Sequence, residues 1–263
     1  MRIWFQSTVE IDSYHAYRQA LLTHFSATAP GVEVHLAGVP GGTWAGLANS
    51  QVMNMPYAYH RILSNTLFEQ LRLAEREGYD AFVLGSFTEP WLRELRSMTD
   101  MPVVSTAEAA VHLALSVSQK FGLVTMNTEN EWFQRINMAA RGLQDRIAGY
   151  YVVRPEATEL EINRIFEDAR GYIDRFTAVA RQAIADGADA IIPSEGLVAT
   201  VMAVNGLRSI DDVPVVDPIA GSVLMAEMLA KMHRATGLMP GRRWHYVKTP
   251  AHIMDHMDRM RQG

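Results

Sequence analysis

Two short stretches of the sequence place polar side chains directly after an apolar run, as happens where the strands of an α/β sheet end. Residues 78–92 read GYDAFVLGSFTEPWL, and residues 187–198 read GADAIIPSEGLV. In open α/β sheets, ligands bind beyond the carboxyl ends of the strands. We therefore expect the reactive and substrate-binding groups to include Ser86, Phe87, Thr88, Ser194, Glu195 and Gly196.

These two stretches also match each other. When Gly78 is aligned with Gly187 and no gap is allowed, Ser86 pairs with Glu195. An alignment with one deletion pairs Ser86 with Ser194 instead, and the sequence leaves both pairings open. In either case, two related strand ends face one shared cleft from opposite walls.

The side chain best suited to act as a general base is Glu195. A carboxylate that is buried in an apolar cleft has a raised pKa, whereas a serine hydroxyl without a base is a poor acid or base near neutral pH. A helix N-terminus beside Glu195 would lower the same pKa, and a plain capping role is the competing explanation. Ser86 and Thr88 suit either anion binding or helix capping, and Glu89 before Pro90 fits the cap position.

Two other predicted strand ends carry polar residues that suit substrate anchoring. Gln6 and Ser7 end a strand that starts at Arg2, and Thr125 ends a strand that starts at Phe121. A turn role is the alternative at both places. A long polar and aromatic loop is expected over residues 44–59, where it would serve as a lid or a partner contact.

Strand and helix patterns alternate along the whole chain, which predicts parallel βαβ units. Together with the duplication, this predicts an α/β fold of two pseudo-symmetric, doubly wound parallel-sheet lobes with a cleft between them. We expect the first lobe to contain residues 1–104 and 220–263, and the second lobe residues 105–219. Within the second lobe we expect one long helix from Thr158 to Ala185 and a strand over residues 213–217.

Composition narrows the function further. The chain has 263 residues, 48% of them hydrophobic, which is enough for a large core. A formal net charge of −5 argues against a nucleic-acid partner, and no segment is predicted to be a signal peptide or a membrane span, so we expect a cytoplasmic protein. Cysteine is absent, which excludes thiol chemistry. We expect no metal site, and a homo-oligomer whose subunit contact includes the segment from Arg242 onward.

The stretch from Ser86 to Leu92 resembles the Cys-Phe-Gly-Asp-Pro-Gly-Leu element of hydantoin racemases, in the aspartate/glutamate/hydantoin racemase superfamily. Residues 102–110 resemble the strand and helix start that follow it, and residues 187–196 and 213–217 resemble the second half of the motif. The resemblance implies an enzyme that needs no cofactor. It also implies proton removal and return, next to a carbonyl or carboxylate, by one cysteine on each side of the cleft.

This chain departs from that pattern at both cysteine positions. Ser86 stands at the first, and Glu195 or Ser194 stands at the second. A mechanism with two thiols is therefore impossible, although related decarboxylases keep only one of the two cysteines.

Three functions remain compatible with the sequence. The first is a cofactor-independent racemase or isomerase that moves a proton on a small carboxylated or cyclic-imide substrate, with Glu195 as the base and Ser86 and Thr88 as anion anchors. The second is a hydrolase or lyase that cleaves a C–N or C–C bond with water activated by Glu195, or with Ser86 as the nucleophile. The third is a non-catalytic protein that binds a carboxylate.

Overall fold

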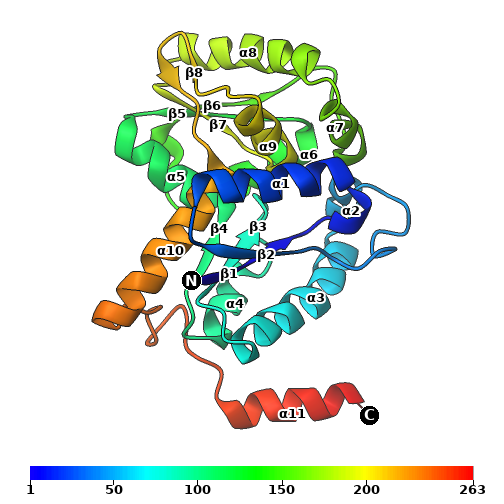
Figure 1. Cartoon of the computed structure of the whole chain (residues 1–263), viewed down its shortest axis with the longest axis vertical. Helices are drawn as coiled ribbons and strands as arrows, with labels where there is room; N and C mark the ends of the chain where they lie inside the picture. Colours follow the sequence, from blue (N-terminus) through cyan, green and yellow to red (C-terminus); the bar gives the residue numbers. More distant parts are fainter. Residues whose placement is uncertain (263) are drawn as a thin grey trace.

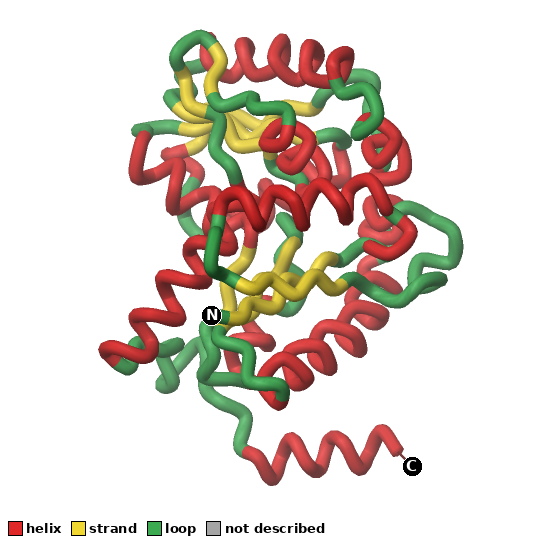
Figure 2. The backbone as a smooth tube through the Cα atoms, in the orientation of Figure 1, coloured by secondary structure: helices red, strands yellow, loops and turns green. Residues whose placement is uncertain are grey.

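The computed structural model describes residues 1–262 and has two lobes, each built on a parallel sheet (Figures 1 and 2). The predicted α/β fold of two lobes is confirmed. The strand orders are β2-β1-β3-β4 in the first sheet and β6-β5-β7 in the second, so the first three strands of each have the same connectivity. The strands are β1 (Arg2–Ser7), β2 (Glu33–Ala37), β3 (Ala81–Gly85), β4 (Val103–Ser105), β5 (Phe121–Thr125), β6 (Ile147–Val152) and β7 (Ala190–Pro193).

Helices cover both faces of the first sheet, because alternate residues of its strands pack into different cores. Phe5 packs in a cluster with residues of α1 (His15–Thr28) and α10 (Pro218–Thr236). Phe82 packs on the opposite face, in a cluster with residues of α3 (Pro56–Arg76). This arrangement explains the near-continuous apolar runs of the central strands.

The edge of the second sheet is more irregular than predicted. The strand expected over residues 213–217 shortens to β9 (Val213–Pro214), which pairs antiparallel with β8 (Ser209–Ile210). Val215 makes a single parallel bridge to Ile191 of β7, in the place that corresponds to β4 in the first sheet. The predicted strand is therefore wrong for most of its length.

Two helix predictions also need correction. The single helix expected to end at Ala185 is divided into α7 (Glu159–Ile165) and α8 (Arg170–Ala185), and Asp168 accepts a hydrogen bond from the Arg170 N–H, 3.3 Å away, where the second helix begins. The predicted loop over residues 44–59 contains α2 (Asn49–Met53) and the first turn of α3. Proline at the first position of α3 supplies the φ angle that a helix start requires.

The remaining helices, except α11, connect and cover the two sheets (Figure 1). Helix α10 packs against both β3 and α5. The division into residues 1–104 with 220–263 and residues 105–219 stays a prediction. Helix α11 lies apart from both sheets, at the red end of Figure 1. None of the helices within residues 1–262 is long and apolar enough to cross a membrane. The helices whose bounds have not yet been given are α4 (Leu92–Met98), α5 (Thr106–Val117), α6 (Thr128–Ala140), α9 (Gly196–Val204) and α11 (Ala251–Gln262).

Candidate active site

The two duplicated stretches occupy equivalent places in the two sheets. Strand β3 begins the same number of residues after Gly78 as β7 begins after Gly187. Both glycines have positive φ angles, 72° at Gly78 and 97° at Gly187. No residue is inserted between these glycines and the strand ends. The strand register therefore aligns Ser86 with Glu195, and it aligns Ser194 with the residue before Ser86.

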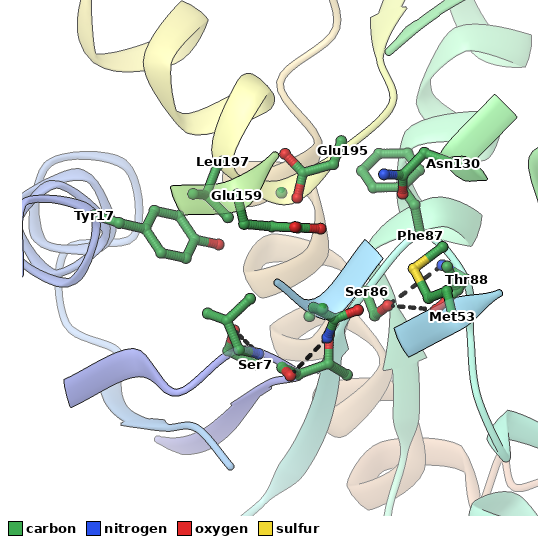
Figure 3. A pocket seen from close by; sticks show the side chains of 15 residues that line it. Ser7, Tyr17, Met53, Ser86, Phe87, Thr88, Asn130, Glu159, Glu195 and Leu197 are labelled. Atoms are coloured by element: carbon green, nitrogen blue, oxygen red, sulfur yellow. Dashed lines mark hydrogen bonds between the residues drawn. The ribbon is translucent and has the colours of Figure 1, made fainter. Parts of the chain in front are cut away.

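The strand ends of the two lobes meet around a small pocket (Figure 3). Of the predicted site residues, Ser7, Ser86, Phe87, Thr88, Glu195 and Gly196 line it. Residues that the sequence did not single out also line it: Val9, Tyr17, Asn49, Met53, Asn130, Glu159 and Leu197. The pocket is thus built from side chains of both lobes.

Three predicted substrate-binding residues, Gln6, Ser194 and Thr125, do not line the pocket. Gln6 accepts a hydrogen bond from the Trp4 indole N–H at 3.1 Å. Ser194 donates its hydroxyl proton to Gln134, 3.0 Å away. Thr125 is fully buried, and its hydroxyl has no hydrogen-bond partner among the described residues. All three side chains are enclosed by protein.

Glu195 caps a helix and faces the pocket at the same time. Its carboxylate accepts a hydrogen bond from the Val198 N–H, 2.9 Å away, at the start of α9, and only 8% of the residue is exposed. Burial and the nearby carboxylate of Glu159 raise the pKa of Glu195 to about 8, against the hydrogen bonds from the first N–H groups of α9, which lower it. The capping role and a proton-transfer role are therefore compatible.

Glu159 is a second buried carboxylate in the pocket, and no local sequence pattern distinguishes it from other glutamates at helix starts. It is the first residue of α7, where Thr158 and Glu161 form a capping box. Ser50 of α2 donates its hydroxyl to the Glu159 carboxylate at 2.7 Å and its backbone N–H at 3.1 Å. Burial raises the pKa of Glu159, and these hydrogen bonds from Ser50 lower it.

The opposite wall of the pocket carries neutral hydroxyl groups. The Ser86 hydroxyl lies 2.9 Å from the hydroxyl oxygen of Thr88, which lies 2.8 Å from that of Tyr59 on α3. Burial raises the pKa of Tyr59 far above neutrality, so its phenol stays protonated. We call Ser86, Thr88 and Tyr59 the hydroxyl chain. It can donate hydrogen bonds, but it has no group that is basic at neutral pH.

The expectation that Glu89 caps a helix at Pro90 is wrong. Trp91 occupies the N-cap of α4, and Glu89 takes a φ of 51°, which turns its side chain behind the pocket wall. There the Glu89 carboxylate pairs with Arg141 at 2.5 Å and accepts a hydrogen bond from Ser105. Burial raises the pKa of Glu89, and Arg141 opposes this rise. Glu89 therefore supports the wall from behind.

Among the described residues that line the pocket, none is lysine, arginine or histidine. Within residues 1–262, no group of three histidine, aspartate or glutamate side chains is arranged to hold a metal ion. The pocket thus combines two carboxyl groups, one neutral hydroxyl chain and the N–H groups at a helix start. Such a set can transfer a proton at Glu195 and donate hydrogen bonds to an oxygen that gains negative charge.

Comparisons with known proteins agree with this architecture. The sequence matches the model of the family Asp/Glu/Hydantoin racemase over residues 55–226. A hydantoin racemase of Paenarthrobacter aurescens is 29% identical over 168 residues, which are 63% of this chain and 68% of that protein.

Solved structures of two allantoin racemases have a similar fold. The enzyme of Pseudomonas fluorescens superposes with a TM-score of 0.72 at 20% identity, covering 95% of this chain and 97% of that one. The enzyme of Klebsiella pneumoniae gives 0.70 at 22% identity, covering 95% and 94%. Since the family match extends over more than half of the sequence, the chain belongs to the Asp/Glu/hydantoin racemase family.

Proposed function

We propose that this racemase-type isomerase moves a proton on a carbon next to a carbonyl group, with Glu195 as the general base. The observation that carries the proposal is the position of Glu195: it is a buried carboxyl at the pocket, equivalent in register to Ser86 and with a pKa near 8. A base with such a pKa can take up and return a proton near neutral pH.

The substrate that best suits this pocket is a small neutral cyclic imide. A carboxylated substrate would meet two buried carboxyl groups without any lysine, arginine or histidine in the described lining. A cyclic imide is uncharged and offers N–H groups to the carboxyls and carbonyl oxygens to the hydroxyl chain. Hydantoin, which the name of the Paenarthrobacter aurescens relative includes, is a compound of this class.

In the proposed reaction the ionised form of Glu195, which is in equilibrium with the predominant protonated form near neutral pH, removes the proton from the carbon and becomes a carboxylic acid. The electron pair of the C–H bond moves into the neighbouring carbonyl group. Tyr59 donates to Thr88 and Thr88 donates to Ser86, so the Ser86 hydroxyl donates its proton to the enolate oxygen that forms. The proton on Glu195 then exchanges with solvent, and a solvent-derived proton returns to the carbon. When the planar enolate has turned over in the pocket, this proton adds to the opposite face and inverts the configuration; the enolate is consumed and Glu195 is ionised again.

A second candidate function follows from the difference between the two walls. Only the Glu195 wall carries a base, because the hydroxyl chain is neutral. One-sided base catalysis also suits a hydrolase or lyase in which Glu195 activates water. Incorporation of ¹⁸O from labelled water into a cleaved product would favour this second function over proton transfer.

The test uses enantiopure 5-substituted hydantoins in D₂O. Proton NMR follows the loss of the C5 hydrogen signal, and polarimetry follows the loss of optical activity, both corrected for the reaction without enzyme. We expect the wild type to exchange this hydrogen and Glu195→Gln to lose at least about 100-fold in rate, which is the usual contribution of a general base.

The matched control is Glu161→Gln, which alters an exposed carboxylate at the start of α7. It should exchange hydrogen like the wild type. If Glu195→Gln exchanged hydrogen as fast as the wild type, the assignment of the base would be wrong.

A further inference from the structure

Glu159 takes no part in the reaction proposed above, although it lies in the same pocket as the base. Glu159 is only 3% exposed. It faces the pocket from the start of α7, and Glu195 faces the same pocket from the N-cap of α9 (Figure 3). A buried carboxylate is costly unless a charge or hydrogen bonds compensate it. The contacts of Glu159 therefore indicate what its role is.

Ser50 supplies that compensation from the other lobe. Its hydroxyl donates to one Glu159 oxygen at 2.7 Å, and its backbone N–H lies within 3.1 and 3.3 Å of the two oxygens. Hydrogen bonds that are donated to a carboxylate favour its charged form. Glu195, in contrast, accepts hydrogen bonds only from the start of its own helix among the contacts recorded for its side chain.

We propose that Glu159 is a positioning residue for Glu195: its negative charge, fixed by Ser50, holds the shared proton of the two carboxyls on Glu195. The two carboxyl groups then carry one proton between them at neutral pH, and Glu195 holds that proton. This inference deepens the proposed function, and it rests on that function only for the statement that Glu195 is the base.

The other titratable groups around the pair do not provide a positive charge. Tyr14, Tyr17 and Tyr172 stay neutral, because burial and the charge of Glu195 raise their pKa values far above neutrality. Glu129 on α6 adds to the negative potential at Glu159, and Glu10 adds to it at Tyr14. Arg175 contacts the ring of Tyr172 on its own helix and does not line the pocket. With no cation to neutralise one carboxylate, the two compete for a proton.

The test is a titration that needs no substrate. Glutamate labelled with ¹³C at the carboxyl carbon is incorporated, and the two signals are assigned by their loss in Glu159→Gln and Glu195→Gln. We expect the Glu195 signal to titrate near pH 8 in the wild type and about one unit or more lower in Glu159→Gln. Glu195 is still protonated in the pH range where Glu159 ionises, so Glu195→Gln should leave the titration of Glu159 nearly unchanged.

Ser50→Ala provides an independent variant. It removes the hydroxyl that stabilises the charged form of Glu159, so the Glu159 titration should rise and the Glu195 titration should fall. Glu161→Gln is the control and should leave both signals unchanged. A Glu195 titration that stays within about 0.3 units of the wild type in both Glu159→Gln and Ser50→Ala would overturn the proposal.

The two proposals fail in distinguishable ways. If the carboxyl titrations are coupled but Glu195→Gln keeps its hydrogen exchange, the pair exists and Glu195 is not the base. If exchange depends on Glu195 but the titrations are independent, Glu195 is the base and Glu159 does not position its proton.

Discussion

The raised pKa of Glu195 predicts a specific dependence of stability on pH. Between pH 4.5 and about 8, the folded protein holds a proton on Glu195 that the unfolded chain has lost. The free energy of unfolding should therefore fall as the pH rises through this window, by about 1.4 kcal/mol per pH unit from this one group. The protonation of Glu195 contributes about 5 kcal/mol in total to the free energy of unfolding. This contribution is fully present below pH 4.5 and is lost above pH 8.

Glu195→Gln removes the titration and keeps the cap, since an amide oxygen can still accept the hydrogen bond from Val198. The variant should be about as stable as the wild type near pH 5 and clearly more stable near pH 8. Urea unfolding at intervals from pH 5 to 9, followed by tryptophan fluorescence and circular dichroism, measures both free energies. The difference between the two proteins isolates Glu195 from other titrating groups.

Glu161→Gln is the control for the substitution itself. Hydrogen bonds from Thr158 lower the pKa of Glu161, so this exposed carboxylate titrates below the window. Its stability curve should run parallel to that of the wild type. If the curve of Glu195→Gln also ran parallel to the wild type from pH 5 to 9, Glu195 would not hold a proton in the folded protein, and the reasoning about the pocket would be refuted.

Two further substitutions test the pocket wall. Arg141→Met should destabilise the protein by about 3–5 kcal/mol, because it leaves Glu89 as an unpaired buried charge, and adding Glu89→Gln should recover most of this loss in urea unfolding. An Arg141→Met variant as stable as the wild type would contradict that account. Tyr59→Phe should cost about 1 kcal/mol in the same assay, since it removes one hydrogen bond from the hydroxyl chain. No loss at all would mean that this contact is not formed in solution.

The sequence predicted the central strands of both sheets, because these depend on local patterns, whereas the strand expected over residues 213–217 was wrong for most of its length. The repeated glycine-to-strand spacing selected both Ser86 and Glu195, and the register of the strands agrees with the alignment that allows no gap. The start of α10 carries equally local marks, because Asp217 caps it and Pro218 occupies its first turn.

What the sequence could not supply were contacts between distant segments. Glu159 looks like an ordinary residue of a helix start, and only its contact with Ser50, 109 positions away in the sequence, shows that it is buried. Glu89 looked like a cap, because a positive φ at a non-glycine residue has no local signature. The division of one predicted helix at residues 166–169 likewise has no glycine or proline to announce it.

The path of α10 has a consequence for the order in which the chain acquires its structure. Buried residues of this helix, such as Val223 and Ala226, belong to the same core as Phe5 of β1. The helix is synthesised only after the whole of the second sheet, so one apolar face of the first sheet stays incompletely covered until then. The amino-terminal half therefore cannot complete its core during translation, and the two lobes must finish folding together.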